Sequence, residues 1–212
     1  MRTIIFDFDG TIADSFATLL GVFEDIVHRR QKLTPEEVEQ LRSKKLREVI
    51  KYLKIKKWQI PGLLIKAKRA ISLKIPGIKP FDGMTEVLQK LHEEGYQMFI
   101  LSTNSSANVS KFLKINGLDS YFIKIYGDIG LRSKASALKK VLNKEKLTAT
   151  QSLYIGDEVR DVEASDKVGI KVIAVGWGFN HPDVLRRANP TALANRPSEL
   201  PGILKKIWPN SV

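Results

Sequence analysis

Two aspartates near the start of the chain have a spacing that suits nucleophilic and acid–base chemistry at one site. They stand in the motif Asp7-Phe8-Asp9-Gly10-Thr11, directly after a run of β-branched and aromatic residues. In an extended segment residues i and i+2 point the same way, so both carboxylates should face one side. An ionised aspartate can accept a phosphoryl group without an activating base, and a neighbouring carboxyl can transfer protons. The motif therefore predicts phosphoryl transfer, against the alternative of a turn that buries an acid.

Three further polar groups stand near strand ends or helix starts. Ser102-Thr103-Asn104 follows the apolar run MFIL and could bind phosphate, or could simply cap a helix. Lys134 stands near a helix start, where solvation at the surface is the plain alternative. Asp157 and Asp161 follow SLYI and suit Mg²⁺, although acids are also common at helix N-termini. Ligands of open α/β sheets bind beyond the carboxyl ends of the strands, so we expect all four groups on one edge.

The elements that must position these groups alternate along most of the chain. Apolar and β-branched runs predict strands at Thr3–Phe8, Gln97–Leu101, Phe122–Tyr126, Ser152–Ile155 and Lys171–Val175, the last of the set. Helical spacing predicts helices at Gly83–Glu94, Ser106–Asn116 and Ser133–Leu142, and another that Gly169 ends. This alternation favours an α/β, Rossmann-like fold of three layers, with a parallel sheet between helices.

Residues 15–80 show helical patterns and no strand-like alternation. Helices are predicted at Ser15–Arg30, Leu46–Leu53 and Leu63–Leu73. Another begins at Thr34, which can serve as its N-cap, with Glu37 completing a capping box. Because the first strand precedes this block and its partners follow it, we expect an all-helical insert at 15–80. The catalytic core would then consist of residues 1–14 and 81–212.

Composition limits the classes of protein that need to be considered. The chain has 212 residues, which suits one domain that carries a small insert, and its 43% of apolar residues can form a real core. It has no cysteine, so disulfides and thiolate metal sites are excluded. No segment approaches 18 consecutive apolar residues, and aspartates interrupt the apolar start too early for a signal peptide. We therefore expect a cytoplasmic protein without membrane spans, either a monomer or a weak dimer.

Positive charge is concentrated in one part of the chain. Residues 40–79 hold thirteen Lys or Arg and the single acid Glu48, so this segment accounts for the whole net charge of +12. Such a segment attracts a phosphorylated metabolite, a nucleic acid or an anionic membrane surface, or it is a solvated helix face. Four cations early in the block are the first candidates for gripping a substrate, namely Arg42, Lys44, Lys45 and Arg47.

The order DFDGT, LSTN, Lys134 and GDEVRD resembles the four-motif order of the haloacid dehalogenase superfamily. The resemblance spans the whole chain, and the first and fourth motifs are the specific ones. A helical insert between the first two motifs resembles the C1 cap of that superfamily. The stretch Gly176-Trp-Gly-Phe-Asn180, followed by Pro190-Thr191 and Ser198-Glu-Leu200, looks like the phosphoglycolate phosphatase branch.

The resemblance implies roles for the acids and the lysine. Asp7 would attack phosphorus and bind Mg²⁺. Asp9 would act as general acid and base, and would give its backbone carbonyl to the metal. Asp157 would be a carboxylate ligand of Mg²⁺, whereas Asp161 would support the metal waters or hold Lys134. Lys134 would neutralise the nucleophile and the group in transfer.

The second motif would bind phosphate through Ser102 and the amide of Thr103, with Asn104 beside them, and Lys134 would contribute. An Asp at position 9 indicates a phosphatase or phosphomutase, since the dehalogenases of the superfamily have Tyr there and the transport ATPases have Thr. The third motif departs from the common pattern, because many relatives place its Lys before Pro and this chain places it before Ala.

The sequence thus predicts a Mg²⁺-dependent phosphatase that hydrolyses a small phosphate monoester, phosphoglycolate-like or a sugar phosphate, through an aspartyl-phosphate. A phosphomutase on the same scaffold is one alternative. The other is a protein that binds nucleic acid or polynucleotide ends through the basic insert. Residues 40–79 contain only Tyr52 and Trp58 as aromatic residues and no recognition motif, which disfavours nucleic acid.

Overall fold

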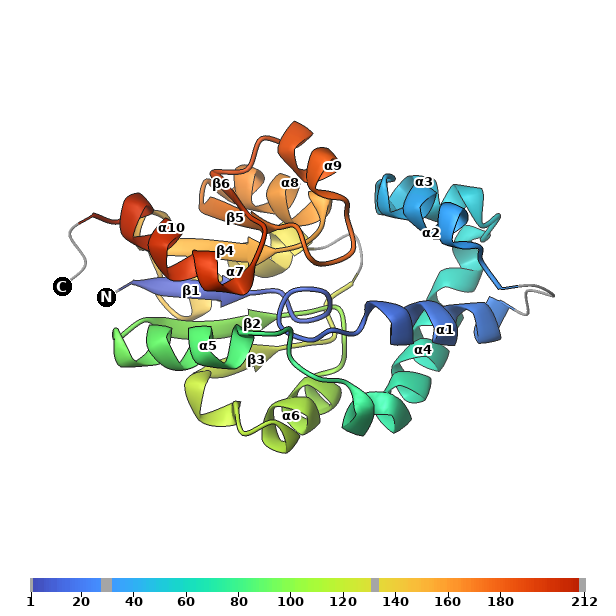
Figure 1. Cartoon of the computed structure of the whole chain (residues 1–212), viewed down its shortest axis with the longest axis horizontal. Coiled ribbons are helices and arrows are strands. Elements are labelled where there is room, and N and C mark those ends of the chain that lie inside the picture. The colour runs from blue at the N-terminus through green and yellow to red at the C-terminus, as the bar shows by residue number, and fades with distance from the viewer. Residues whose placement is uncertain (1, 28–31, 131–133, 210–212) are drawn as a thin grey trace.

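Six parallel strands form the centre of the computed structural model, which describes residues 2–27, 32–130 and 134–209 (Figure 1). The strands are β1 (Thr3–Phe6), β2 (Gln97–Leu101), β3 (Lys124–Tyr126), β4 (Ser152–Gly156), β5 (Lys171–Val175) and β6 (Ala192–Ala194). Their order in the sheet is β3-β2-β1-β4-β5-β6, and every neighbouring pair is parallel. The direction of winding therefore reverses beside β1, where open sheets of this kind bind ligands. The predicted α/β, Rossmann-like fold is confirmed.

The strand predictions were wrong in three places. The set does not end at β5, because Ala192–Ala194 adds a sixth strand; this Ala-Leu-Ala segment carries no β-branched signal, and pairing with β5 alone makes it a strand. The first strand ends at Phe6 rather than at Phe8, because the Phe8 carbonyl already accepts the amides of a turn, those of Thr11, Ile12 and Ala13. The strand expected from Phe122 begins only at Lys124.

Helices cover both faces of the sheet. One face packs against α5 (Met84–Glu93), α6 (Ser106–Ile115) and α10 (Leu200–Ile207). The other packs against α7 (Lys134–Lys144), α8 (Val159–Val168) and α9 (Pro182–Arg187). Alternation along β1 accounts for the two cores, since Ile4 and Phe6 belong to the first and Ile5 to the second. The helix expected from Ser133 begins at Lys134, and Ser133 lies outside the described residues.

Between β1 and α5 the described residues form helices and no strand. The helices are α1 (Phe16–Val27), α2 (Pro35–Arg42), α3 (Leu46–Tyr52) and α4 (Ile60–Lys74), with short 3-10 turns. The capping box of α2 forms as predicted, since the Thr34 hydroxyl accepts the Glu37 amide at 3.3 Å and the Glu37 carboxylate accepts the Thr34 amide at 2.9 Å. The helix expected at Ser15–Arg30 is described as far as Val27; residues 28–30 lie outside the described part.

This helical insert lies beyond the carboxyl ends of the strands, where the strand arrows point in Figure 1. Its longest helices, α1 and α4, pack on one another. A small apolar cluster of Leu33, Leu41 and Val49 packs against Phe179 from the segment after β5. The insert is thus attached to the sheet domain beside the strand ends. No helix among the described residues is long and apolar enough to cross a membrane.

Candidate active site

The first motif leaves the sheet at its centre. The register aligns Phe6 with Ile100 of β2 and with Ile155 of β4, so the three strands end at one level. The Asp7 amide still donates to the Ile155 carbonyl at 2.8 Å. Asp7 therefore stands between the segments that follow β2 and β4, which carry Ser102 and Asp157.

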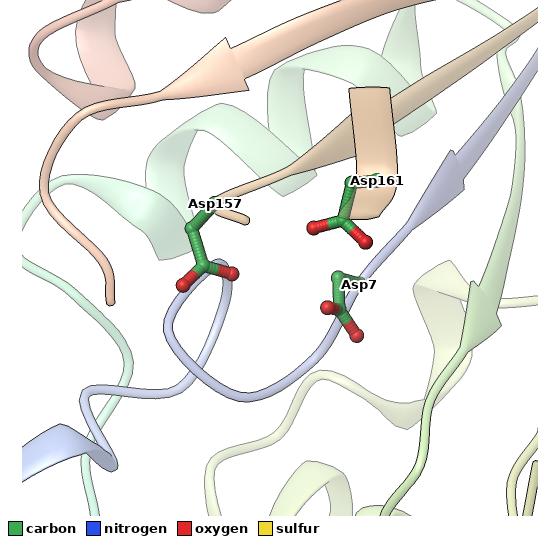
Figure 2. Close-up of side chains that lie close together, drawn as sticks. All are labelled: Asp7, Asp157 and Asp161. Atoms are coloured by element: carbon green, nitrogen blue, oxygen red, sulfur yellow. The ribbon is translucent and has the colours of Figure 1, made fainter. Parts of the chain in front are cut away.

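Three carboxylates converge at this edge (Figure 2). Each of Asp7, Asp157 and Asp161 offers an oxygen that lies within 4.8 Å of the others, and all three side chains are buried. Burial, followed by repulsion from Asp7, holds the pKa of Asp157 well above its usual range. Burial raises the pKa of Asp161 to about 6, although attraction to Lys134 opposes the rise. Clustered carboxylate oxygens in need of a counter-charge form a donor set that suits Mg²⁺.

Lys134 supplies a positive charge to two of these acids. Its Nζ lies 2.6 Å from Asp7 Oδ2 and also pairs with Asp161 Oδ1, and its side chain is only 3% exposed. Burial alone would lower the pKa of Lys134, but attraction from Asp161 and Asp7 outweighs it and the pKa is raised. The two lysines one turn later, Lys139 and Lys140, are exposed. The lysine of the third motif thus lies beside the first and fourth motifs.

Asp9 has neutral hydrogen-bond partners. The Ser15 hydroxyl donates to its Oδ1 at 2.8 Å and the Asn104 side-chain amide donates to its Oδ2 at 3.0 Å. Burial raises the pKa of Asp9 to about 6, and repulsion from Asp7 adds to the rise. A carboxyl with such a pKa can both give and take a proton near neutral pH.

Asp157 is fixed by two donors and by two glycines. The Thr11 hydroxyl donates to its Oδ1 at 2.8 Å, and the Phe179 amide donates to its Oδ2 at 2.7 Å. A Cβ on Gly10 would lie 2.3 Å from Asp157 Oδ2, and one on Gly178 would lie 2.3 Å from Asp157 Cβ. Only glycine at these positions allows both loops to close around the carboxylate.

The second motif lines the site on the β2 side. Ser102 is buried and its hydroxyl accepts the Asn104 amide at 3.0 Å, while Thr103 is half-buried between them. The Asn104 side chain, expected near phosphate, instead donates to Asp9 and accepts from the Asn108 side-chain amide at 2.9 Å. Within this motif Ser102 and Thr103 are therefore the groups still available for an anion.

A model of the haloacid dehalogenase-like hydrolase family matches residues 4–175. The chain belongs to this family. A phosphoglycolate phosphatase of Synechococcus elongatus is 33% identical over 204 residues, which are 94% of this chain and 95% of that protein. A phosphoglycolate phosphatase of Pseudomonas fluorescens is 25% identical over 233 residues, covering 96% of this chain and 80% of that protein. The resemblance to the phosphoglycolate phosphatase-like branch is thereby confirmed.

Solved structures of haloacid dehalogenase-like proteins share the fold. A Clostridium acetobutylicum protein described as a predicted phosphatase superposes with a TM-score of 0.83 at 20% identity, over 96% of this chain and 98% of that chain. A member of the family from Streptococcus pneumoniae superposes with a TM-score of 0.79 at 22% identity, over 96% of this chain and 98% of that chain. At these identities the likeness shows the fold alone.

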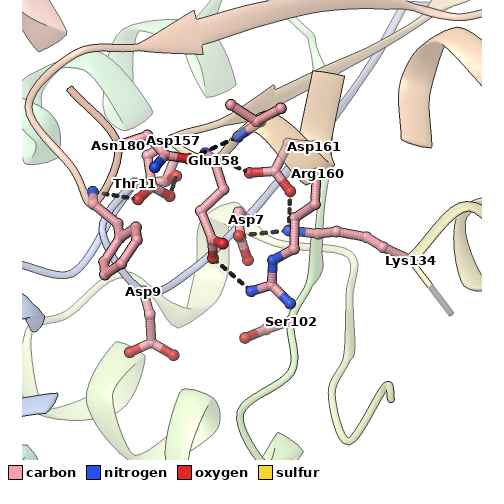
Figure 3. Close-up of polar contacts among 12 residues, drawn as sticks. Asp7, Asp9, Thr11, Ser102, Lys134, Asp157, Glu158, Arg160, Asp161 and Asn180 are labelled. Carbon is pink, nitrogen blue, oxygen red and sulfur yellow. Dashed lines mark hydrogen bonds and ion pairs between the residues drawn. The ribbon is translucent and has the colours of Figure 1, made fainter. Parts of the chain in front are cut away.

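Several polar residues at this haloacid dehalogenase-like site had no role assigned from the sequence. They are Thr11, Ser15, Asn108, Glu158, Arg160 and Asn180, whose contacts surround the predicted residues. Figure 3 labels four of them: Thr11, Glu158, Arg160 and Asn180. Four of them lie inside motifs that could have indicated them: Thr11 in DFDGT, Glu158 and Arg160 in GDEVRD, and Asn180 in GWGFN. Ser15 and Asn108 stand in no motif, and only the folded chain brings them to the site.

Proposed function

We propose that the chain is a Mg²⁺-dependent phosphatase that hydrolyses a small phosphate monoester through an aspartyl-phosphate on Asp7. The observation that carries this proposal is the buried group of Asp7, Lys134, Asp157 and Asp161 at the strand ends, with Asp9 beside it. The relatives named phosphoglycolate phosphatase support a small phosphorylated carboxylic acid as the substrate class. A sugar phosphate is the other candidate substrate.

The reaction would use the chain's own groups in two steps. A carboxylate oxygen of Asp7 attacks phosphorus, the bond from phosphorus to the ester oxygen breaks, and Asp9 gives that oxygen its proton. Asp9 then takes a proton from water as the water attacks phosphorus, and the bond to Asp7 breaks to release phosphate. Ser102, the Thr103 amide and Lys134 would bind the phosphoryl oxygens throughout.

Mg²⁺, when bound, would offset the repulsion between the phosphate and the carboxylates. Asp7, Asp157 and the backbone carbonyl of Asp9 would hold it, because hard oxygen donors are the ligands this ion prefers. Asp161 would act indirectly, since one of its oxygens pairs with Lys134 and the other accepts the Glu158 amide at 2.9 Å.

The division into parts also belongs to this proposal. Residues 1–14 and 81–212 would form the catalytic core, and residues 15–80 would form a cap that closes over the substrate and excludes water. The position of the helical insert beyond the strand ends supports this division. The basic segment within the insert would favour an anionic metabolite.

The test compares Asp7→Asn with Asp14→Asn on a panel of phosphate monoesters with Mg²⁺. Asp7→Asn should lower kcat by at least about a thousandfold, because the amide cannot attack phosphorus. Asp14→Asn should leave kcat unchanged, because Asp14 is exposed and its side chain has no described contact with the site. More than a few per cent of residual activity in Asp7→Asn with a normal melting curve would reject the covalent route. Release of an isomerised sugar phosphate without free phosphate would indicate a phosphomutase instead.

A further inference from the structure

Arg160 places an incompletely paired guanidinium at the active site. It lies in the first turn of α8, and its side chain is 19% exposed. Nη2 donates to Glu158 Oε1 at 2.5 Å. Nε and Nη1 are buried and have no hydrogen-bond partner among the described residues. Figure 3 shows the guanidinium between Glu158 and Ser102, on the same side of the site as the end of Lys134.

The unpaired nitrogens of such a group favour binding of a ligand. A buried donor that is left unpaired destabilises the folded chain, and more so when it is charged. Glu158 occupies one nitrogen of the guanidinium, and two donor nitrogens remain. Oxygens of an anion would satisfy both, and the planar, permanently charged guanidinium suits phosphate.

The surroundings indicate which anion this would be. Figure 3 draws the guanidinium in the direction of Ser102, and its positive charge opposes the raised pKa of Lys134. Both residues are proposed above to bind the phosphoryl group. The charge of Arg160 also acts on the reacting acids, because it opposes the rise in the pKa of both Asp9 and Asp161. The guanidinium is therefore close to the reacting centre.

We propose that Arg160 binds the oxygens of the phosphoryl group in transfer, together with Ser102 and Lys134. Glu158 balances the charge of the guanidinium while no phosphate is bound. This role rests on the proposed phosphatase function. It adds a catalytic residue within the fourth motif, between the two aspartates.

The competing explanation is that Arg160 only neutralises Glu158. The two explanations predict different effects of replacing Glu158 on phosphate binding. If Arg160 binds phosphate, Glu158→Gln should leave phosphate affinity unchanged or raise it, because a repelling carboxylate is gone. If the ion pair is purely structural, Glu158→Gln and Arg160→Met should weaken phosphate binding to the same extent. The double variant should then bind phosphate no more weakly than either single variant.

The experiment measures binding of inorganic phosphate by calorimetry in the presence of Mg²⁺, and its inhibition constant against a monoester. Arg160→Met should weaken phosphate binding at least about tenfold, which is about 1.4 kcal/mol. Arg160→Lys should recover part of that loss, since lysine keeps the positive charge but lacks the planar set of donors of the guanidinium. Lys167→Met is the matched control, an exposed cation on the same helix, and should bind phosphate as the wild type does.

Three results would overturn the proposal. One is equal loss of phosphate binding in Glu158→Gln and Arg160→Met. Another is unchanged phosphate binding in Arg160→Met with a loss confined to substrates that carry a second anionic group, such as phosphoglycolate compared with phenyl phosphate. The third is absence of phosphate binding in the wild type.

If Arg160→Met does not fold, Arg160→Lys carries the same comparison. If phosphate binding depends on Arg160 but no monoester is hydrolysed, the proposed phosphatase function is rejected and the role of Arg160 in binding phosphate stands.

Discussion

Asp157 and Asp161 carry the same side chain four residues apart, but different groups face them. Asp161 has Lys134 as a counter-charge, whereas the donors to Asp157 among the described residues are neutral, namely Thr11 and the amide of Phe179. The pKa of Asp157 is accordingly raised well above its usual range, while that of Asp161 rises to about 6. Asp157, which has no cationic partner in the described part of the chain, is the acid whose charged form a metal ion would stabilise most.

This difference leads to a prediction about metal binding. Mg²⁺ should raise the Tm of the wild-type protein, because an ion that binds only the folded state stabilises it. Asp157→Ala should abolish most of this rise, and Asp161→Ala should reduce it less. Asp166→Ala, at an exposed acid of the same helix, should keep the full rise. The measurement is thermal unfolding with Mg²⁺ and with chelator. A larger loss in Asp161→Ala would mean that the two acids have exchanged roles.

At the scale of elements, the segment Gly178–His181 joins the helical insert to the carboxylate cluster. Arg42, at the end of α2, donates to the carbonyls of Gly178 and Phe179 at 3.0 and 3.1 Å. The Asn180 side-chain amide donates to the carbonyls of Arg42 and Lys44, both at 3.0 Å. Since the amide of Phe179 holds Asp157, the position of the insert and that of this acid depend on one segment.

Arg42 was a candidate for binding the substrate, but its guanidinium donates to the backbone carbonyls of Gly178 and Phe179. We therefore predict that Arg42→Ala lowers kcat/KM about tenfold by loosening the insert, with hydrogen exchange increasing in α2 and in Gly178–His181. Arg47→Ala is the matched control, because Arg47 is exposed on the same insert and should affect exchange in neither segment. If Arg42→Ala lowers kcat/KM while exchange stays unchanged, a direct contact with substrate is the better explanation.

The segment Gly178–His181 also makes contacts that could not be predicted from the sequence. The placement of the four motifs at one edge of the sheet and the capping box of α2 could be predicted, because the first follows from the shared edge at which parallel strands end and the second from local spacing. Contacts between Arg42 and Gly178 could not, because they join residues 136 positions apart through carbonyls that carry no sequence signal. Asn104 illustrates the same limit, since its side chain could serve phosphate or Asp9 and only the fold decides.

At the scale of the whole molecule, the basic segment lies on the insert beyond the strand ends, so its charge faces the region through which a substrate must approach. Three of its cations have described partners: Arg42 as above, Lys45 with Glu163 at 2.7 Å, and Lys68 with Asp128 at 2.7 Å. Most of the others are exposed, without an ion-pair partner among the described residues. Exposed charges act mainly through their summed field rather than by fixed contacts.

A summed field predicts a particular dependence on salt. Its reach falls from about 10 Å at 0.1 M salt to about 3 Å at 1 M, so kcat/KM for a phosphate dianion should fall steeply with ionic strength while kcat changes little. Replacing Lys54, Lys56 and Lys57 with Gln should flatten this dependence. Replacing Lys139, Lys140 and Lys144, exposed on α7 of the sheet domain, removes the same charge and should flatten it less. Equal slopes for both triple variants would show that net charge matters and its position on the insert does not. A slope already flat in the wild type would mean that the basic segment does not steer the substrate.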